Sequence, residues 1–224
     1  MSSLRTFVSS SVGTKVLIAL TGLAFFGFLV LHLAGNLLIL VDADGFNAYS
    51  HKLIANPLLP VAEAGLAAII LLHVYKTLTN YGRNLRARPT GYAKKKWAGH
   101  TSRKSVASSS MIVTGTIVLA FLTIHLAHFK FGTYYEDALH GYRDLARLVR
   151  ETFVQPPWVL WYLVAMTLIG IHLRHGLGSA FQSLGLEHPR YNAWVRALGI
   201  VLAIVIAGGF ALIPIWIYVT GGRS

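Results

Sequence analysis

Four histidines lie inside apolar stretches of this chain, where an imidazole needs a partner. They are His32 in LVLHLAGN, His73 in IILLHVYK, His125 in LTIHLAHF and His172 in LIGIHLRHG. A polar ring that leaves water without gaining a hydrogen bond or a metal costs roughly 2–7 kcal/mol, depending on the reference state. Because the chain has no cysteine, thiolate-ligated clusters, covalently attached c-type haem and disulfides within the chain are excluded. Histidine is therefore the obvious metal ligand.

The elements that carry these histidines are predicted to be membrane spans. The chain has 224 residues, of which 54% are hydrophobic and 12% are charged, whereas a soluble domain has about 25% charged residues. Five charge-poor runs approach the ~20 residues that a helix needs to cross ~30 Å of hydrocarbon. The predicted fold class is all-α, a single integral membrane domain over 1–224. Its five transmembrane helices are expected at about 16–41, 58–79, 106–130, 157–181 and 196–220.

Basic residues predict the orientation of these spans. Arg5 and Lys15 precede the first span, and the connection 76–104 is rich in lysine and arginine. By the positive-inside rule the N-terminus lies in the cytoplasm and the C-terminus outside, in a multi-pass protein of the inner (cytoplasmic) membrane. The net charge of +12 is then mainly a topology signal, and no nucleic acid is expected as a partner. The basic inner face suits anionic membrane lipid or an acidic docking partner.

The direction of the helices places the four histidines at two depths. Spans 1 and 3 run outward, so His32 and His125 lie toward the outside. Spans 2 and 4 run inward, so His73 and His172 lie toward the cytoplasm. Two imidazoles that face each other across a helix bundle suit the two axial positions of a b-type haem. The pattern predicts two haem b groups, with iron held by His73 and His172 near the cytoplasm and by His32 and His125 near the outside.

Two of these ligands are followed three residues later by a second histidine, namely His128 and His175. Because residues i and i+3 lie on similar helix faces, spacing alone leaves the second histidine of each pair open as a ligand. Depth favours the first, since Lys130 and Arg174 place the second near the membrane surface. We expect His128 and His175 to hydrogen-bond a propionate, a quinone or water.

Haem propionates need cationic or hydrogen-bonding partners at both levels. On the cytoplasmic side the candidates are Ser10, Ser11, Lys15, Arg174 and His175, although Lys15 and Arg174 could instead extend to the lipid headgroups. On the outer side the candidates are Asn36, Tyr49, His51 and Lys130. Glycines in the spans either make room for a flat macrocycle or serve as ordinary helix contacts: Gly22, Gly27, Gly65, Gly115, Gly170, Gly176 and Gly178.

Glu63 is the carboxylate expected within a span, near the outer surface. An intramembrane carboxylate is a functional-site hypothesis by default. Reduction of a quinone needs a proton donor beside a carbonyl oxygen, so Glu63 is a candidate catalytic proton donor to a quinone on the outer side. Alternatively, Glu63 contacts His51 or Asn47 and only stabilises the bend of the chain at the start of the second span. The segment Tyr134–Phe153 has an apolar and a charged side and is predicted to be an amphipathic helix on the outer face.

The pattern resembles one family, the single-chain, five-helix, di-haem cytochrome b subunits of succinate dehydrogenases (succinate:quinone oxidoreductases) and quinol:fumarate reductases. The resemblance runs through nearly the whole chain. It is carried by SSSVGTKVLIALTGL leading to HLAGNLLIL, by FNAYSHKLIANPLL, by HVYK and by HLRHGLGSAFQSLG. The resemblance implies one axial ligand from each of the first four spans, with those of spans 2 and 4 on the haem nearer the iron–sulfur subunit.

The resemblance also implies the partners of this chain. A flavoprotein subunit with the dicarboxylate site and an iron–sulfur subunit would dock on the cytoplasmic face, where the 83–104 segment could be a docking surface for the iron–sulfur subunit. The chain itself would be the membrane anchor and the quinone-reactive subunit of the enzyme, with menaquinone as the expected quinone. A homo-oligomer of the complex stays open. The acidic residues that family members commonly carry near the fourth-span histidine are missing from LIGIHLRH.

Two other functions fit parts of the pattern. One is the di-haem cytochrome b subunit of another quinone-linked dehydrogenase or reductase, such as a formate dehydrogenase or nitrate reductase, which would bring a molybdenum subunit. The other is a haem-free transporter that uses the buried histidines as a proton relay. A transporter predicts a colourless protein and favours broken helices and internal repeats.

Overall fold

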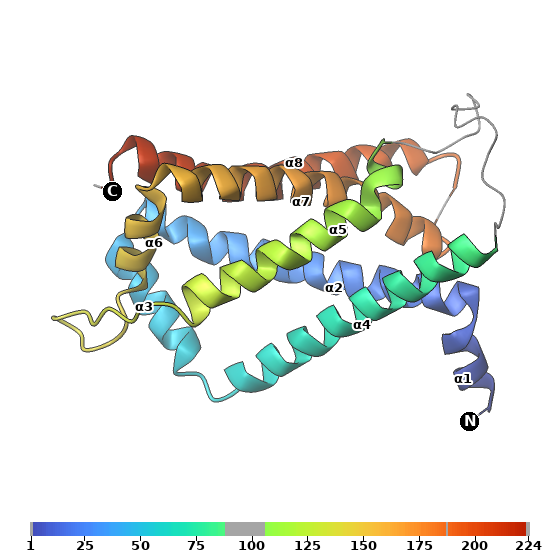
Figure 1. Cartoon of the computed structure of the whole chain (residues 1–224), viewed down its shortest axis with the longest axis horizontal. Helices are drawn as coiled ribbons and strands as arrows, with labels where there is room; N and C mark the ends of the chain where they lie inside the picture. The colour runs from blue at the N-terminus through green and yellow to red at the C-terminus, as the bar shows by residue number, and fades with distance from the viewer. Residues whose placement is uncertain (1, 88–105, 187, 223–224) are drawn as a thin grey trace.

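The computed structural model describes residues 2–87, 106–186 and 188–222. In this part of the chain, five helices are long and apolar enough to cross a membrane. They are α2 (Ser11–Leu37), α4 (Leu59–Arg86), α5 (Val106–His125), α7 (Pro156–Ser183) and α8 (Asn192–Val219). They run side by side along the long axis of the molecule (Figure 1). The predicted all-α fold with five candidate membrane spans is confirmed.

Shorter elements lie at the two ends of this bundle (Figure 1). Helix α1 (Ser2–Ser9) leads into α2 at one end, which we call the α1 end. Helices α3 (Ala43–Ile54) and α6 (Leu145–Phe153) lie at the other, the α3/α6 end, together with the last turn of α8. A 3-10 turn, η1 (Leu38–Leu40), extends α2, and a π-helical turn, η2 (Leu126–Lys130), extends α5.

Local chemistry sets where the long helices begin. The Ser10 hydroxyl accepts a hydrogen bond from the Gly13 N–H at 3.0 Å, so α2 begins at Ser11, earlier than the expected start at about 16. Prolines occupy the first turns of α4 and α7, where backbone N–H groups have no partner within the helix. Most of the basic connection 76–104 lies outside the described residues, but its first part, to Arg86, continues α4.

The predicted helix over Tyr134–Phe153 is wrong in its first half. Helix α6 begins only after Asp144, whose carboxylate accepts a hydrogen bond from the Arg147 N–H at 3.0 Å and caps the helix. Before this cap the chain forms a loop in which Gly141 has a φ of 69°, a left-handed conformation that is foreign to an α-helix. The apolar side of α6 is buried in the protein, at Ala146, Val149 and Phe153.

The tightly packed core lies toward the α3/α6 end, around α7. Helix α7 packs against α2, α5 and α8, and α2 packs against α4. Tyr162, Ala165 and Met166 of α7 are buried there. Helix α4 has no buried residue and exposes large apolar side chains such as Val61 and Leu71. An apolar exposed face is expected of a helix in contact with lipid, because lipid tails are as apolar as leucine.

Candidate functional site

The most prominent feature of the molecule is a cavity of about 2220 Å³ lined by residues of α2, α4, α5 and α7. It extends from Lys15 near the α1 end to Tyr142 in the loop at the α3/α6 end, and most of its wall is apolar. Pockets for ordinary small ligands measure about 300–1,000 Å³. The cavity therefore has room for more than one large ligand. All four histidines predicted as ligands line it: His32, His73, His125 and His172.

Within the cavity the histidines form two levels. Near the α3/α6 end, the ring centroids of His32 and His125 are 5.9 Å apart, with the rings nearly perpendicular. Nearer the α1 end, His73 lies against Gly22 of α2 and His172 lies against Gly115 of α5, and both line the cavity. His32 follows Gly22, which lies against His73, by ten residues, so the levels are about 15 Å apart along α2.

All four rings share one feature, a side-chain hydrogen-bond partner at Nδ1. Such a partner fixes the orientation of an imidazole, and a partner that accepts from Nδ1 also leaves Nε2 as the nitrogen for a metal. The partner atoms are Thr21 Oγ1 for His73 (2.9 Å), Thr114 Oγ1 for His172 (3.3 Å), Tyr162 Oη for His125 (2.9 Å) and Asn36 Nδ2 for His32 (3.3 Å).

Three of these partners, Thr21, Thr114 and Tyr162, are missing from the candidates that the sequence suggests. One signal for two of them is present in the sequence. A Thr-Gly dipeptide stands eleven residues before His32, and another stands eleven residues before His125. Tyr162 has no such signal, because its contact with His125 depends on how α5 and α7 pack together.

The glycines of the spans divide between the two predicted roles. A Cβ atom on Gly22 would lie 3.4 Å from Cε1 of His73, and one on Gly115 would lie 3.3 Å from Cε1 of His172. These two glycines make room for an imidazole. By contrast, a Cβ on Gly170 would meet the Cβ of Ala207 in α8 at 3.1 Å, so Gly170 is a helix contact. The remaining candidates face open space: Gly27, Gly65, Gly176 and Gly178.

The second histidine of each i, i+3 pair has a different position in the structure. His175 lines the cavity about one turn after His172. His128 instead reaches α6, where its Nε2 is 2.8 Å from Thr152 Oγ1, and its ring centroid is 4.3 Å from that of Trp158. The wider π-helical turn of η2 explains why His128 does not share the face of His125.

The candidates for propionate contacts are distributed unevenly around the cavity. Near the α1 end, Lys15 and His175 line it, whereas Arg174 and Ser11 are exposed. The Ser10 hydroxyl already accepts from Gly13 and donates to the Phe7 carbonyl at 2.7 Å. At the α3/α6 end, all four candidates line the cavity: Asn36, Tyr49, His51 and Lys130.

Glu63 lies on the cavity wall at the α3/α6 end, as does Lys130. The two form an ion pair in which the side chains remain 43% and 40% exposed, respectively. Glu63 is therefore held by Lys130 of η2 rather than by His51 or Asn47, the neighbours considered from the sequence. This arrangement keeps a carboxylate in contact with both the cavity and the surface.

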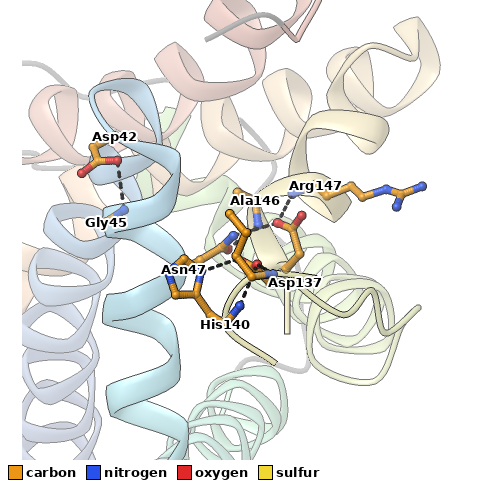
Figure 2. Close-up of polar contacts among 9 residues, drawn as sticks. Asp42, Gly45, Asn47, Asp137, His140, Ala146 and Arg147 are labelled. Carbon is orange, nitrogen blue, oxygen red and sulfur yellow. Dashed lines mark hydrogen bonds and ion pairs between the residues drawn. The ribbon is translucent and has the colours of Figure 1, made fainter. Parts of the chain in front are cut away.

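Asn47 has a structural role at this end of the molecule. Its side chain is buried, and its Nδ2 donates to Asp144 Oδ1 at 2.7 Å, while its Oδ1 accepts from the Ala146 N–H at 2.8 Å. Figure 2 shows Asn47 reaching from α3 toward Ala146 of α6. Asn47 thus joins α3 to the first turn of α6, and the two helices close the α3/α6 end of the cavity.

The exposed loop beside this joint contains a second polar cluster (Figure 2). Asp137 accepts hydrogen bonds from the Leu139 N–H at 2.8 Å and from His140 Nδ1 at 3.1 Å. These bonds, the Leu139 one foremost, hold the pKa of Asp137 below its usual range. His140 also stacks on Tyr142, which stacks on His51, so the loop is fixed over the cavity mouth.

Comparison of the chain with models of known protein families, with curated proteins and with solved structures found no match. The functional argument therefore depends on the chain's own geometry. That geometry is a bundle with five helices suited to crossing a membrane, around a cavity in which four partly buried histidines stand at two levels.

Proposed function

We propose that this chain is the membrane anchor and di-haem cytochrome b subunit of a succinate:quinone oxidoreductase or quinol:fumarate reductase. One observation carries the proposal. Four histidines, one from each of α2, α4, α5 and α7, line a single cavity at two levels, with the rings of His32 and His125 next to each other at one level and His73 and His172 at the other. The resemblance of the sequence to the di-haem family adds the identity of the complex.

The donor set fits haem better than it fits a bare metal ion. Among the described residues, no group of three or more His, Asp or Glu gathers to hold an ion, although tetrahedral zinc sites need three or four protein ligands. Two imidazoles suffice at a haem, because the macrocycle supplies the other iron ligands. His73 and His172 would hold one haem and His32 and His125 the other. A bound haem b supplies one-electron transfer at each level.

The residues of the chain support this chemistry in three ways. The Nδ1 partners orient each ring, Gly22 and Gly115 leave space for two of the rings, and the mostly apolar wall suits a macrocycle. Lys15 and His175 near the α1 end would pair with propionates, as would Asn36, Tyr49, His51 and Lys130 at the other end, since all of them line the cavity. Glu63, held by Lys130, would exchange protons with a quinone at the α3/α6 end.

The α1 end is the proposed cytoplasmic face and the docking side of the soluble subunits. Lys15 and Arg83 lie at this end, and Arg83 donates to Thr14 Oγ1 of α2 at 3.4 Å. The iron–sulfur subunit would exchange electrons with the haem near this end, and a flavoprotein behind it would carry the dicarboxylate site. This chain then carries electrons across the membrane and reacts with the quinone, which we propose is menaquinone.

Purification of the tagged chain from its native membranes in a mild detergent tests this function. We expect a red complex in which a flavoprotein and an iron–sulfur subunit co-purify and in which succinate reduces both haem and added quinone. Co-purification of a molybdenum-containing partner would instead assign the chain to another quinone-linked dehydrogenase or reductase. A colourless, well-folded preparation would contradict the proposal and favour a transporter.

A further inference from the structure

Both histidines nearer the α1 end meet the same dipeptide on a neighbouring helix. Thr21-Gly22 of α2 faces His73 of α4, and Thr114-Gly115 of α5 faces His172 of α7. We call each dipeptide a threonine–glycine clamp. In both clamps the threonine hydroxyl lies beside Nδ1 and the glycine lies beside Cε1 of the same ring. Helices α2 and α5 are far apart in the sequence, yet each holds a histidine of a neighbouring helix through the same pair of contacts.

The two clamps also occupy equivalent places on their helices. Each threonine stands eleven residues before the histidine of the second level, His32 on α2 and His125 on α5. Eleven residues are close to three helical turns and span about 16 Å. Each of these helices therefore presents, on one face, a clamp for one level and a ligand for the other.

The hydrogen bonds of the clamps determine which ring nitrogen carries the proton. Thr21 is buried, and its hydroxyl donates to the Leu17 carbonyl at 2.6 Å. Thr114 is buried too, and its hydroxyl donates to the Ser110 carbonyl at 3.1 Å. A hydroxyl has a single hydrogen, so a hydroxyl that donates to a carbonyl can only accept from the imidazole.

A carbonyl contact supports the same assignment at His73. The Thr21 hydroxyl has a second carbonyl acceptor in its own helix, that of Ile18 at 3.1 Å. Its one hydrogen is therefore directed to carbonyls, and Nδ1 of His73 must carry the hydrogen of the Thr21–His73 bond. Nε2 is then left with a lone pair, which is the state that an iron ligand requires.

The other level is held differently. His125 Nδ1 meets the phenol of Tyr162, and His32 Nδ1 meets the amide nitrogen of Asn36, which also donates to the His32 carbonyl at 2.7 Å. Neither partner is a threonine, and neither His32 nor His125 lies against a glycine of a clamp. A substitution in either clamp should therefore affect the histidines of one level and leave those of the other level unchanged.

We propose that Thr21 and Thr114 are positioning residues that hold His73 and His172 in the Nδ1-protonated tautomer and lower the midpoint potential of the haem between them. The inference rests on the proposed di-haem function. An Nδ1–H that donates to an acceptor makes the ring a stronger electron donor, which favours ferric over ferrous iron. The adjacent glycines let each ring approach the backbone that carries the hydroxyl.

Potentiometric titration of the purified, haem-loaded protein tests the inference with Thr21→Val and Thr114→Val, which keep the shape and remove the hydroxyl. If removal weakens the preference for ferric iron about tenfold, within the range known for such outer partners, the midpoint of one haem rises by about 59 mV for one electron. The midpoint of the second haem should stay at the wild-type value. Low-temperature EPR of the ferric protein should change for the same haem alone.

Two further variants complete the experiment. Thr114→Ser keeps a hydroxyl and should restore the wild-type midpoints. Thr123→Val is a matched control on α5, since within the described part of the chain the Thr123 hydroxyl bonds only its own helix, at the Leu119 carbonyl. Two haems with unchanged midpoints in both valine variants would overturn the inference. If a valine variant loses one haem, retention of both by Thr114→Ser supports the inference and loss in Thr114→Ser overturns it. A wild-type chain without haem would instead overturn the proposed function.

Discussion

At the scale of residues, the central feature is that His32, His73, His125 and His172 each use one ring nitrogen, Nδ1, for a hydrogen bond to another side chain. Among the described residues, the side-chain hydrogen bonds of these four rings all involve Nδ1. These bonds offset part of the cost of removing an imidazole from water. At His73 and His172, where the partner hydroxyl donates to a carbonyl, they also leave Nε2 for chemistry, so these histidines can be well held and still be ligands.

Gly115→Ala should disturb one haem and leave the other unchanged. The new Cβ would lie 3.3 Å from Cε1 of His172, so the ring must move by a few tenths of an ångström. The fold should not weaken, since alanine is favoured over glycine inside a helix by about 1 kcal/mol. Absorption spectra and haem content measure the effect, and Gly27→Ala, which faces open space, is the control. Equal behaviour of the two variants would contradict the role given to Gly115.

Glu63→Gln should slow quinone reduction and leave both haems bound. The variant removes the proton donor at the cavity wall beside Lys130 and leaves all four Nδ1 partners in place. Since a positioned acid or base contributes about 10²–10⁴-fold to a rate, we expect a loss of at least about 10²-fold in quinone turnover. The matched control is Glu151→Gln, because Glu151 pairs with Arg147 at the same end. An unaffected rate in Glu63→Gln would remove this carboxylate from the quinone site.

Some of these residues can be predicted from the sequence, and others cannot. A histidine in an apolar run is conspicuous, so the four span histidines that line the cavity could be predicted. Threonine is ordinary in a helix, where its hydroxyl commonly bonds the preceding turn, so the repeated Thr-Gly spacing is the signal in the sequence for Thr21 and Thr114. The Glu63–Lys130 pair joins residues 67 positions apart, and such a contact depends on tertiary packing.

At the scale of elements, the predictable part is where the apolar runs lie. All five expected spans correspond to helices of the structure, because a long charge-poor run in lipid must satisfy its backbone within itself. The ends are less predictable. The Ser10 and Asp144 caps start α2 and α6 at positions that hydrophobicity does not mark. In a regular α-helix His128 would share a face with His125, but the π-helical turn of η2 points it toward Thr152 of α6 instead.

Asn47→Ala should loosen the joint between α3 and α6. The substitution leaves the buried N–H of Ala146 without its acceptor and removes the donor to Asp144. An unsatisfied buried polar group costs about 1–3 kcal/mol, so the midpoint of thermal unfolding in detergent should fall. Asn56→Ala is the control, since Asn56 is exposed and its side chain accepts only from the Leu58 N–H. Equal midpoints for the two variants would show that Asn47 does not carry this joint.

At the scale of the whole molecule, the two ends have different chemistry. The α1 end carries Lys15, Lys76 and Arg83, and Lys76 donates to the Val8 carbonyl of α1 at 3.0 Å. The α3/α6 end carries the acidic and aromatic loop over the cavity mouth, where a hydrogen bond from Tyr135, and then one from Arg147, hold the pKa of Glu151 below its usual range. The two levels of histidines lie between these ends. The direction of each span sets the depth of its histidine, so the sequence predicts which histidines share a level.

The orientation of the molecule can be tested because the chain has no cysteine. Arg5→Cys places a single thiol at the α1 end, and Leu139→Cys places one in the opposite loop, where Leu139 is 89% exposed. With the N-terminus in the cytoplasm, a membrane-impermeant maleimide should label Leu139→Cys in right-side-out vesicles and Arg5→Cys only after permeabilisation. The reverse pattern would contradict the proposed orientation and move the docking face to the α3/α6 end.

The most direct test of the central claim is a dithionite-reduced minus oxidised absorption spectrum with a pyridine haemochrome count. It would be recorded on the purified wild type and on His32→Ala, His73→Ala, His125→Ala and His172→Ala, with His140→Ala as a control in the exposed loop. We predict two haem b per chain. His73→Ala and His172→Ala should disturb one spectral component, His32→Ala and His125→Ala the other, and His140→Ala neither. A well-folded wild type without haem, or variants whose effects do not follow these pairs, would contradict the account.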